Sequence, residues 1–157
     1  MAGKITPDPK AVFLNVPFDR GYEPQFVALI STLIAIGRTP RCVLEVAETG
    51  EGRLPRLLDH IRGCEVSVHD LSRVGVPARF NMPFELGLAC AVAQLEPGYK
   101  FILLERIPFR LQKTLSDING RDPYIHDGTV HGTISCILEA LGPSRDVPDI
   151  ADVVKYC

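Results

Sequence analysis

Two acidic residues, Asp70 and Glu85, stand at the edges of apolar segments, where a carboxyl group could do chemistry. Asp70 ends the apolar run EVSVHD, and Glu85 lies near the start of a long apolar segment. Three apolar residues follow Glu85 at spacings of three, four and seven: Leu88, Ala89 and Val92. On a helix these positions share one stripe, so Glu85 points inward. A buried carboxylate needs a partner, a raised pKa or a ligand.

The two acids together suggest chemistry at a sugar carbon. Acid/base or nucleophilic reactions there use two carboxyl groups in differing environments. We therefore predict that Glu85 and Asp70 are catalytic residues lining a common hollow. Each also has a structural interpretation. Asp70 can cap the turn that follows it, and Glu85 can complement the dipole and free N–H groups of a helix start.

Charged and polar residues gather in the loops near both acids. We assign substrate binding to ten of them, in chain order: Pro17, Phe18, Asp19, Arg20, His69, Ser72, Arg73, Arg79, Asn81 and Met82. The arginines can hold hydroxyls or phosphates. Arginines on loops are, however, often solvated or paired with surface acids, so this part of the assignment has a structural alternative.

The elements that must position these residues alternate along the chain. Runs typical of buried strands occupy residues 11–16, 41–46, 65–70 and 99–105, with a short one at 123–126. Helical patterns occupy 26–34, 54–61, 83–95, 109–118 and 130–141. Such alternation predicts right-handed crossovers and a parallel sheet covered on both faces. Ligands then bind beyond the carboxyl ends of the strands, at a topological switch point.

We predict one domain over residues 1–157, with a core at 11–142 and a C-terminal tail at 143–157. Its expected fold is a three-layer αβα sandwich around a five-stranded parallel sheet in the flavodoxin-like order 2-1-3-4-5. The switch point then lies between the first and third strands, so the loops after Val16 and Asp70 face each other.

Three segments carry a resemblance to a known family: VFLNVPFD, the HD pair that ends in Asp70, and PFELGLACAVAQ. They resemble the nucleoside 2-deoxyribosyltransferases, most specifically where Glu85, Gly87 and Ala89 match an E-x-G-x-A pattern. The resemblance implies that Glu85 is the nucleophile on the anomeric carbon and that Asp70 contacts the base or assists its protonation. The layout is also similar to bacterial Toll/interleukin-1 receptor-like (TIR-like) domains, some of which cleave the nicotinamide glycosidic bond of NAD with a helix-borne Glu.

The chain departs from the transferase pattern just before Glu85. Where the family has an Asp and a Gly-Thr, this chain reads RFNM from Arg79 to Met82. The departure favours a broader N-glycosidase or nucleotide-processing function, and the arginine suits a phosphorylated substrate. The family's supporting tyrosine has no clear counterpart, although Tyr22 is near enough to be considered.

We therefore expect cleavage or transfer at the N-glycosidic bond of a nucleoside, a nucleotide or NAD, without a cofactor or metal. The alternative is a non-catalytic module that binds a nucleotide-derived signal or mediates assembly, as TIR-like domains do. Self-association fits both look-alike families, so we expect a homo-oligomer. For Phe80 and Phe84 we favour core packing over a place in that interface.

Other classes of site have less support. A phospho-acceptor receiver domain needs an acidic pair after the first strand and a lysine after the fifth, where this chain has Asn15-Val16-Pro17 and His126-Asp127. The histidines follow no metal-ligand spacing, so we expect strand-end and capping roles for them and for Asp127. The chain has no G-x-S-x-G, P-loop or G-x-G-x-x-G motif.

Composition bounds the partners and the compartment. The 157 residues carry a net charge of -2 and are 46% hydrophobic, so we expect a globular domain that does not bind nucleic acid. Five cysteines without a C-x-x-C pair suit free thiols in a reducing cytoplasm: Cys42, Cys64, Cys90, Cys136 and Cys157. The most apolar stretch, 26–37, is too short for a bilayer, so no membrane partner is expected. Residues 1–10 do not resemble a secretion signal.

Overall fold

The chain folds around one parallel sheet. The computed structural model describes residues 5–43, 52–74, 79–118 and 120–142. Its elements are β1 (Asp8–Asn15), α1 (Glu23–Ala35), β2 (Thr39–Cys42), α2 (Arg53–Arg62), β3 (Cys64–Asp70), α3 (Asn81–Leu95), β4 (Lys100–Glu105), α4 (Arg110–Thr114), the 3-10 helix η2 (Ser116–Ile118), β5 (Tyr124–Ile125) and α5 (Val130–Leu141). The described strands form a five-stranded, all-parallel sheet in the order β2-β1-β3-β4-β5. The predicted flavodoxin-like fold is confirmed.

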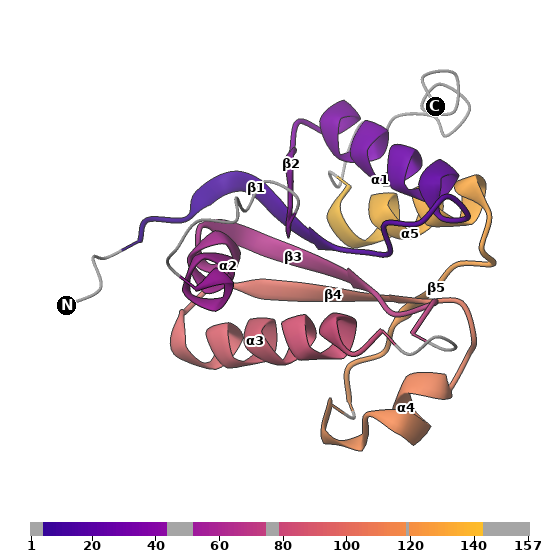
Figure 1. The fold of residues 1–157 in the computed structure, drawn as a ribbon. Helices are drawn as coiled ribbons and strands as arrows, with labels where there is room; N and C mark the ends of the chain where they lie inside the picture. The colour runs from indigo at the N-terminus through magenta and orange to yellow at the C-terminus, as the bar shows by residue number, and fades with distance from the viewer. Residues whose placement is uncertain (1–4, 44–51, 75–78, 119, 143–157) are drawn as a thin grey trace.

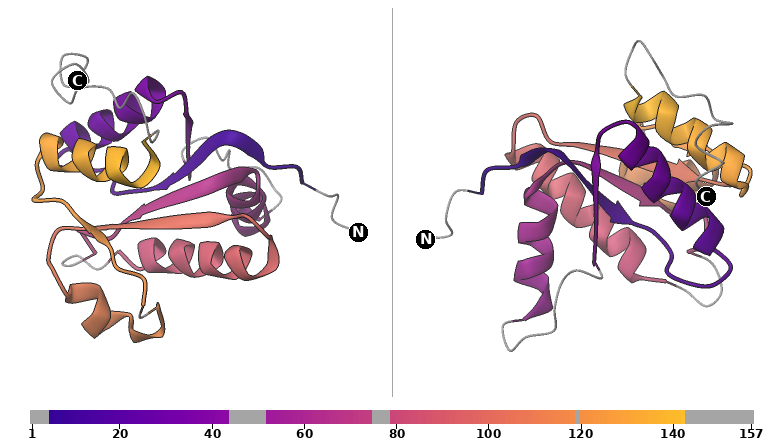
Figure 2. Two further views of the ribbon diagram at one scale, coloured as in Figure 1. Left: turned by 180° about the vertical axis from the view of Figure 1, so that it is seen from behind. Right: turned by 90° about the horizontal axis from the view of Figure 1, so that it is seen from above.

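Helices cover both faces of this sheet. Helices α1 and α5 pack together on one face, and α2 and α3 pack together on the other (Figures 1 and 2). The handedness of the crossovers explains this division. The step from β1 to β2 and the step from β3 to β4 run in opposite directions across the sheet. Right-handed connections therefore place α1 and α3 on opposite faces.

The pleat of the strands decides which side chains meet which helices. In β1, Val12 and Leu14 pack with α1 and α5, whereas Phe13 packs with α2 and α3. Val68 of β3 also belongs to the α1/α5 core. Because successive side chains of a strand alternate, Asp70 shares the face of Val68, and the residue between them, His69, takes the face of α3.

Element boundaries differ from the sequence prediction at a few places. Helix α3 begins at Asn81, two residues before Pro83, so Asn81 and Met82 are helical and not part of the loop. Proline is tolerated there because the first turn of a helix needs no N–H donors. The predicted helix at 109–118 divides into α4 and η2. Residues 44–46 of the second predicted strand and the predicted tail at 143–157 lie outside the described residues.

Two further expectations concern buried and exposed side chains. Phe80 and Phe84 are 80% and 53% exposed, so the prediction that they pack in the core is wrong. Their neighbour Glu85 takes the buried stripe, which turns both rings towards the surface. No disulfide is recorded for Cys42, Cys64, Cys90 or Cys136 among the described residues, and Cys157 lies outside them. In the part of the chain that the structure describes, no helix is long and apolar enough to cross a membrane.

Candidate functional site

Glu85 lies in the second turn of α3 and is shielded from water. Its side chain is only 4% exposed, on the stripe that also buries Ala89 and Val92. The inward orientation predicted from the spacing is therefore confirmed. The helix starts at Asn81, and no capping hydrogen bond of Glu85 is recorded among the described residues. Helix capping thus does not account for its burial.

A hollow of about 430 Å³ opens beside Glu85, between α2 and α3. Its walls are Arg53, Leu54 and Leu57 of α2 and Asn81, Phe84 and Glu85 of α3. The Oε2 atom of Glu85 is buried and has no hydrogen-bond partner within the described chain. A buried acceptor without a partner is costly to the folded state unless the carboxyl is protonated or a ligand contacts it.

Burial shifts the titration of this carboxyl group. It raises the pKa of Glu85 from 4.5 to about 7, although the positive charge of Arg53 opposes the shift. Both protonation states are therefore populated near neutral pH. A carboxyl group poised in this way inside a hollow is suited to acid/base or nucleophilic work.

A buried polar network fastens the start of α3 to the sheet. The Asn15 side-chain amide donates to the Met82 carbonyl at 2.8 Å and contacts His69 Nδ1 at 2.9 Å. His69 Nε2 lies 2.8 Å from the Ser67 hydroxyl. Since the Asn15 nitrogen can only donate, His69 Nδ1 accepts and Nε2 carries the proton. Met82 thus contributes its backbone carbonyl, one turn before Glu85.

His69 lines neither the hollow at Glu85 nor the one above Asp70. Its side chain is fully buried, both ring nitrogens are engaged, and burial lowers its pKa from 6.5 to about 3. The ring therefore remains neutral and serves the core. We correct the assignment of His69 to substrate binding, because the pleat points it into the α3 face instead of towards the strand ends.

Asp70 is buried at the end of β3 on the opposite face. The Tyr22 hydroxyl donates to its Oδ2, His126 Nε2 lies 3.2 Å from the same oxygen, and the Ser72 backbone N–H donates to Oδ1 at 2.8 Å. Through the contact with Ser72, Asp70 caps the turn that follows it, which is the structural interpretation given above for this residue. Tyr22 is the residue just before α1 and His126 directly follows β5, so Asp70 joins three distant segments.

These contacts hold Asp70 in its charged form. Burial alone would raise the pKa of Asp70, but the contacts from His126, Ser72 and Tyr22 outweigh burial and lower it. Burial and the neighbouring Asp70 charge raise the pKa of Tyr22 well above 10, so the phenol keeps its proton. Tyr22 and Ser72 line a second hollow above Asp70, of about 370 Å³.

The expected common hollow for Glu85 and Asp70 is therefore not what the structure has. The described walls of the two hollows share no residue, and the two acids belong to opposite faces of the sheet. The physical reason is the pleat: Asp70 follows Val68 towards α1 and α5, whereas α3 covers the other face. Asp70 is thus not placed to assist a reaction at Glu85.

Asp19 ties two of the predicted loop arginines together. Its carboxylate lies 3.0 Å from Arg73 Nη1 and 2.8 Å from Arg79 Nη2, and it also accepts from the Gly21 N–H at 2.9 Å. Arg73 also lines the hollow above Asp70, whereas Arg79 lies just before α3. The pairing with a surface acid that sequence left open is therefore what these arginines adopt.

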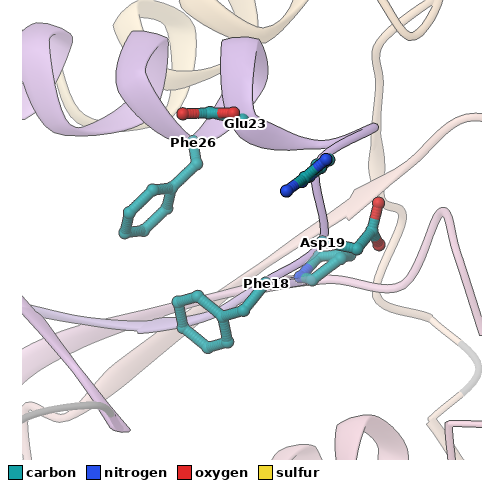
Figure 3. Close-up of a pocket in the computed structure, with 6 residues that line it drawn as sticks. Phe18, Asp19, Glu23 and Phe26 are labelled. Atoms are coloured by element: carbon teal, nitrogen blue, oxygen red, sulfur yellow. The ribbon is translucent and has the colours of Figure 1, made fainter.

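The remaining predicted residues line a third, smaller hollow. Pro17, Phe18, Asp19 and Arg20 border a space of about 230 Å³ beside α1. Figure 3 shows Phe26 of α1 extending towards Phe18, and the two rings meet edge to face with centroids 5.4 Å apart. This hollow is mainly apolar and has no buried titratable group in its described lining. It therefore offers mainly apolar packing surface.

Several residues around the hollows were not predicted as site residues. Asn15 and His126 had a usable signal, because each is a polar residue in or directly after a strand. The sequence carries no such signal for three other residues, because a polar residue in a helix or loop is usually solvated: Arg53, Gln25 and Arg106.

The described residues contain no group of three or more His, Cys, Asp or Glu side chains that could hold a metal ion. Comparison with known protein families and with curated proteins found no match for this chain. The likeness to the deoxyribosyltransferases and TIR-like domains therefore stays a resemblance, and the function must be argued from the hollows themselves.

Proposed function

We propose that this protein cleaves the N-glycosidic bond of a ribosyl substrate (a nucleoside, a nucleotide or NAD) in the hollow between α2 and α3. One observation carries the proposal: a buried carboxyl group, Glu85, with an oxygen free of protein partners, faces a hollow of about 430 Å³. Ribosyl transfer passes through a cation-like sugar carbon, which a carboxylate stabilises or attacks.

The surroundings of Glu85 strengthen that effect. Leu54 and Leu57 line the hollow beside Glu85, and the burial of the carboxyl group lowers the local dielectric, so a charge on Glu85 acts on the sugar more strongly than it would in water. A carboxylate on an exposed helix surface would not offer this advantage.

The other walls suit the remaining parts of a nucleotide. Phe84 is half exposed at the hollow and offers a ring on which a base can stack. The Arg53 guanidinium can pair with a phosphate, and the Asn81 amide can donate to or accept from a ribose hydroxyl. These assignments also retain Asn81 as a substrate-binding residue.

The leaving group narrows the substrate class. A neutral purine or pyrimidine departs readily only when an acid protonates it, and Glu85 is the one acid in the described lining of this hollow. The nicotinamide of NAD is already cationic. When its C1′–N bond breaks, the electron pair passes to nitrogen and the base leaves neutral. Water then supplies the oxygen on C1′ and loses a proton. We therefore favour NAD or another pyridinium riboside.

The test is base release by the purified protein. NAD, AMP, adenosine, uridine and deoxyadenosine are incubated separately and free base is measured by chromatography. We expect nicotinamide from NAD, and we expect Glu85→Gln to reduce its release by about a hundredfold or more. Glu139→Gln, the same change at an exposed position of α5, is the matched control and should behave as wild type.

Two results would reject the proposal. If Glu85→Gln turns over NAD at the wild-type rate, Glu85 is not the reacting group. If the wild type releases no base from any compound while calorimetry detects binding of one, the protein is the non-catalytic nucleotide-binding module that sequence left as the alternative.

A further inference from the structure

A second hollow, distinct from the one at Glu85, lies at the switch point between β1 and β3. Its volume is about 370 Å³. The residues that line it follow four different strands: Gly21, Tyr22, Gln25, Ser72, Arg73, Arg106, His126 and Gly128. We propose that this hollow binds the phosphate group of a small phosphorylated sugar. The proposal does not rest on the reaction proposed for Glu85.

The charge in this hollow favours an anion. Its described lining has two guanidinium groups, Arg73 and Arg106, and no acid. Arg73 and Arg79 both pair with the Asp19 carboxylate, so this single negative charge does not neutralise both guanidinium groups. No ion pair of the Arg106 side chain is recorded with a described residue. Guanidinium groups bind phosphate through paired, charge-assisted hydrogen bonds.

The negative charge beneath the hollow does not cancel this attraction. Asp70 is fully buried, and contacts from Tyr22, Ser72 and His126 occupy both of its oxygens. A carboxylate satisfied in this way fixes Tyr22 and His126 as walls of the hollow. Asp70 is therefore a positioning residue there.

The titratable groups in these walls are suited to binding and not to reaction. His126 Nδ1 accepts from the Gly128 N–H at 3.1 Å, and its Nε2 faces Asp70. The Tyr22 hydroxyl donates its hydrogen bond to the Asp70 carboxylate. Both groups are thus directed at Asp70. The charged groups left to face a ligand are the arginines, which hold phosphate without reacting.

The rest of the ligand can also be described. The Gln25 side chain donates to the Gly128 carbonyl, and its Oε1 is a buried acceptor without a described partner. A hydroxyl beside the phosphate would supply the missing donor. The volume is near the lower end of the range for ligand pockets, about 300–1,000 Å³. A pentose phosphate fits these requirements.

Calorimetry at constant ionic strength tests the proposal with three probes: ribose 5-phosphate, inorganic phosphate and ribose. For the wild type we expect binding of ribose 5-phosphate, weaker binding of phosphate and none of ribose. Arg106→Gln should weaken ribose 5-phosphate binding about tenfold or more. Lys113→Gln, which removes an exposed charge from α4, should leave it unchanged.

Glu85→Gln separates the two sites, because it alters only the other hollow and should bind ribose 5-phosphate as the wild type does. The proposal is overturned if neither phosphate compound binds, if ribose binds equally well, or if Arg106→Gln binds like Lys113→Gln. Loss of binding in Glu85→Gln would also overturn it, since the phosphate would then lie between α2 and α3. Arg106 is exposed, so its variant is expected to fold, and a thermal melt checks this.

Discussion

At the scale of single residues, the chemistry depends on how the protein treats one carboxyl group. Removing Glu85 from water disfavours its charged form, and Arg53 offsets this only in part, so its pKa rises to about 7. The same burial that prepares the group for reaction destabilises the folded protein whenever the group ionises. Activity and stability should therefore respond to pH through the same residue.

Stability measurements on Glu85→Gln test this coupling. A folded-state pKa raised from 4.5 to about 7 means that the folded protein binds more protons across that interval, so ionisation lowers its stability as pH rises. Relative to the wild type, the variant should gain on the order of 1–3 kcal/mol between pH 4 and pH 8. Urea denaturation at the two pH values measures the difference. A difference that does not change with pH would contradict the account.

The sequence predicts part of the site because helix periodicity is a local property. The stripe of Leu88, Ala89 and Val92 correctly gives the burial of Glu85. Arg53, which lines the same hollow as Glu85, is brought there by the packing of α2 against α3. The residue type alone does not predict that packing. The face of Asp70 can be predicted only when the alternation of side chains along β3 is combined with the handedness of the crossovers.

At the scale of elements, the position of Glu85 depends on how α3 is attached to the sheet. Asn15, at the end of β1, donates to the Met82 carbonyl in the first turn of α3 and also engages His69 of β3. One side chain thus joins two strands and a helix. It sets where the next turn of α3, with Glu85, meets α2.

Replacing Asn15 should therefore loosen this junction. Asn15→Ala removes one donor from the Met82 carbonyl and leaves His69 Nδ1 buried without a donor, which should cost about 1–3 kcal/mol of unfolding free energy. Chemical denaturation measures the loss. Gln94→Ala, at an exposed position of the same helix, is the control and should change stability by less than about 0.5 kcal/mol. Equal effects of the two substitutions would show that Asn15 does not fasten α3.

Most helices and strands are predictable because apolar runs and helical stripes are strong signals in an α/β chain. The residues at which these elements begin and end are less predictable. The sequence places the start of the third helix at Pro83, but the helix extends back by two residues to Asn81, where Asn15 donates to the Met82 carbonyl. That contact joins the end of β1 to the first turn of α3, and no local pattern contains it.

At the scale of the whole molecule, the sheet separates two hollows of different character. The one between α2 and α3 is bordered by exposed apolar side chains, Phe84 and Leu54, and the exposed Phe80 lies four residues before Phe84 in sequence. The one at the switch point is lined mainly by polar groups. Exposed apolar groups of this size commonly mark ligand or protein contacts.

The homo-oligomer expected from sequence stays a prediction, and the exposed phenylalanines indicate where to test it. We expect light scattering after size-exclusion chromatography to give a mass above that of one chain. Phe80→Ser should lower this mass, whereas Leu95→Ser, an equally exposed apolar position at the other end of α3, should not. A wild type with the mass of one chain, or equal behaviour of the two variants, would contradict this expectation.

The proposed reaction depends on a carboxyl group that titrates near neutrality because the protein keeps it out of water. Carbon-13 NMR of the side-chain carboxyl groups follows this directly, with the Glu85 resonance assigned by its loss in Glu85→Gln. We predict a titration midpoint near pH 7 for Glu85. A midpoint near 4.5, the ordinary value for a glutamate in water, would contradict the central claim.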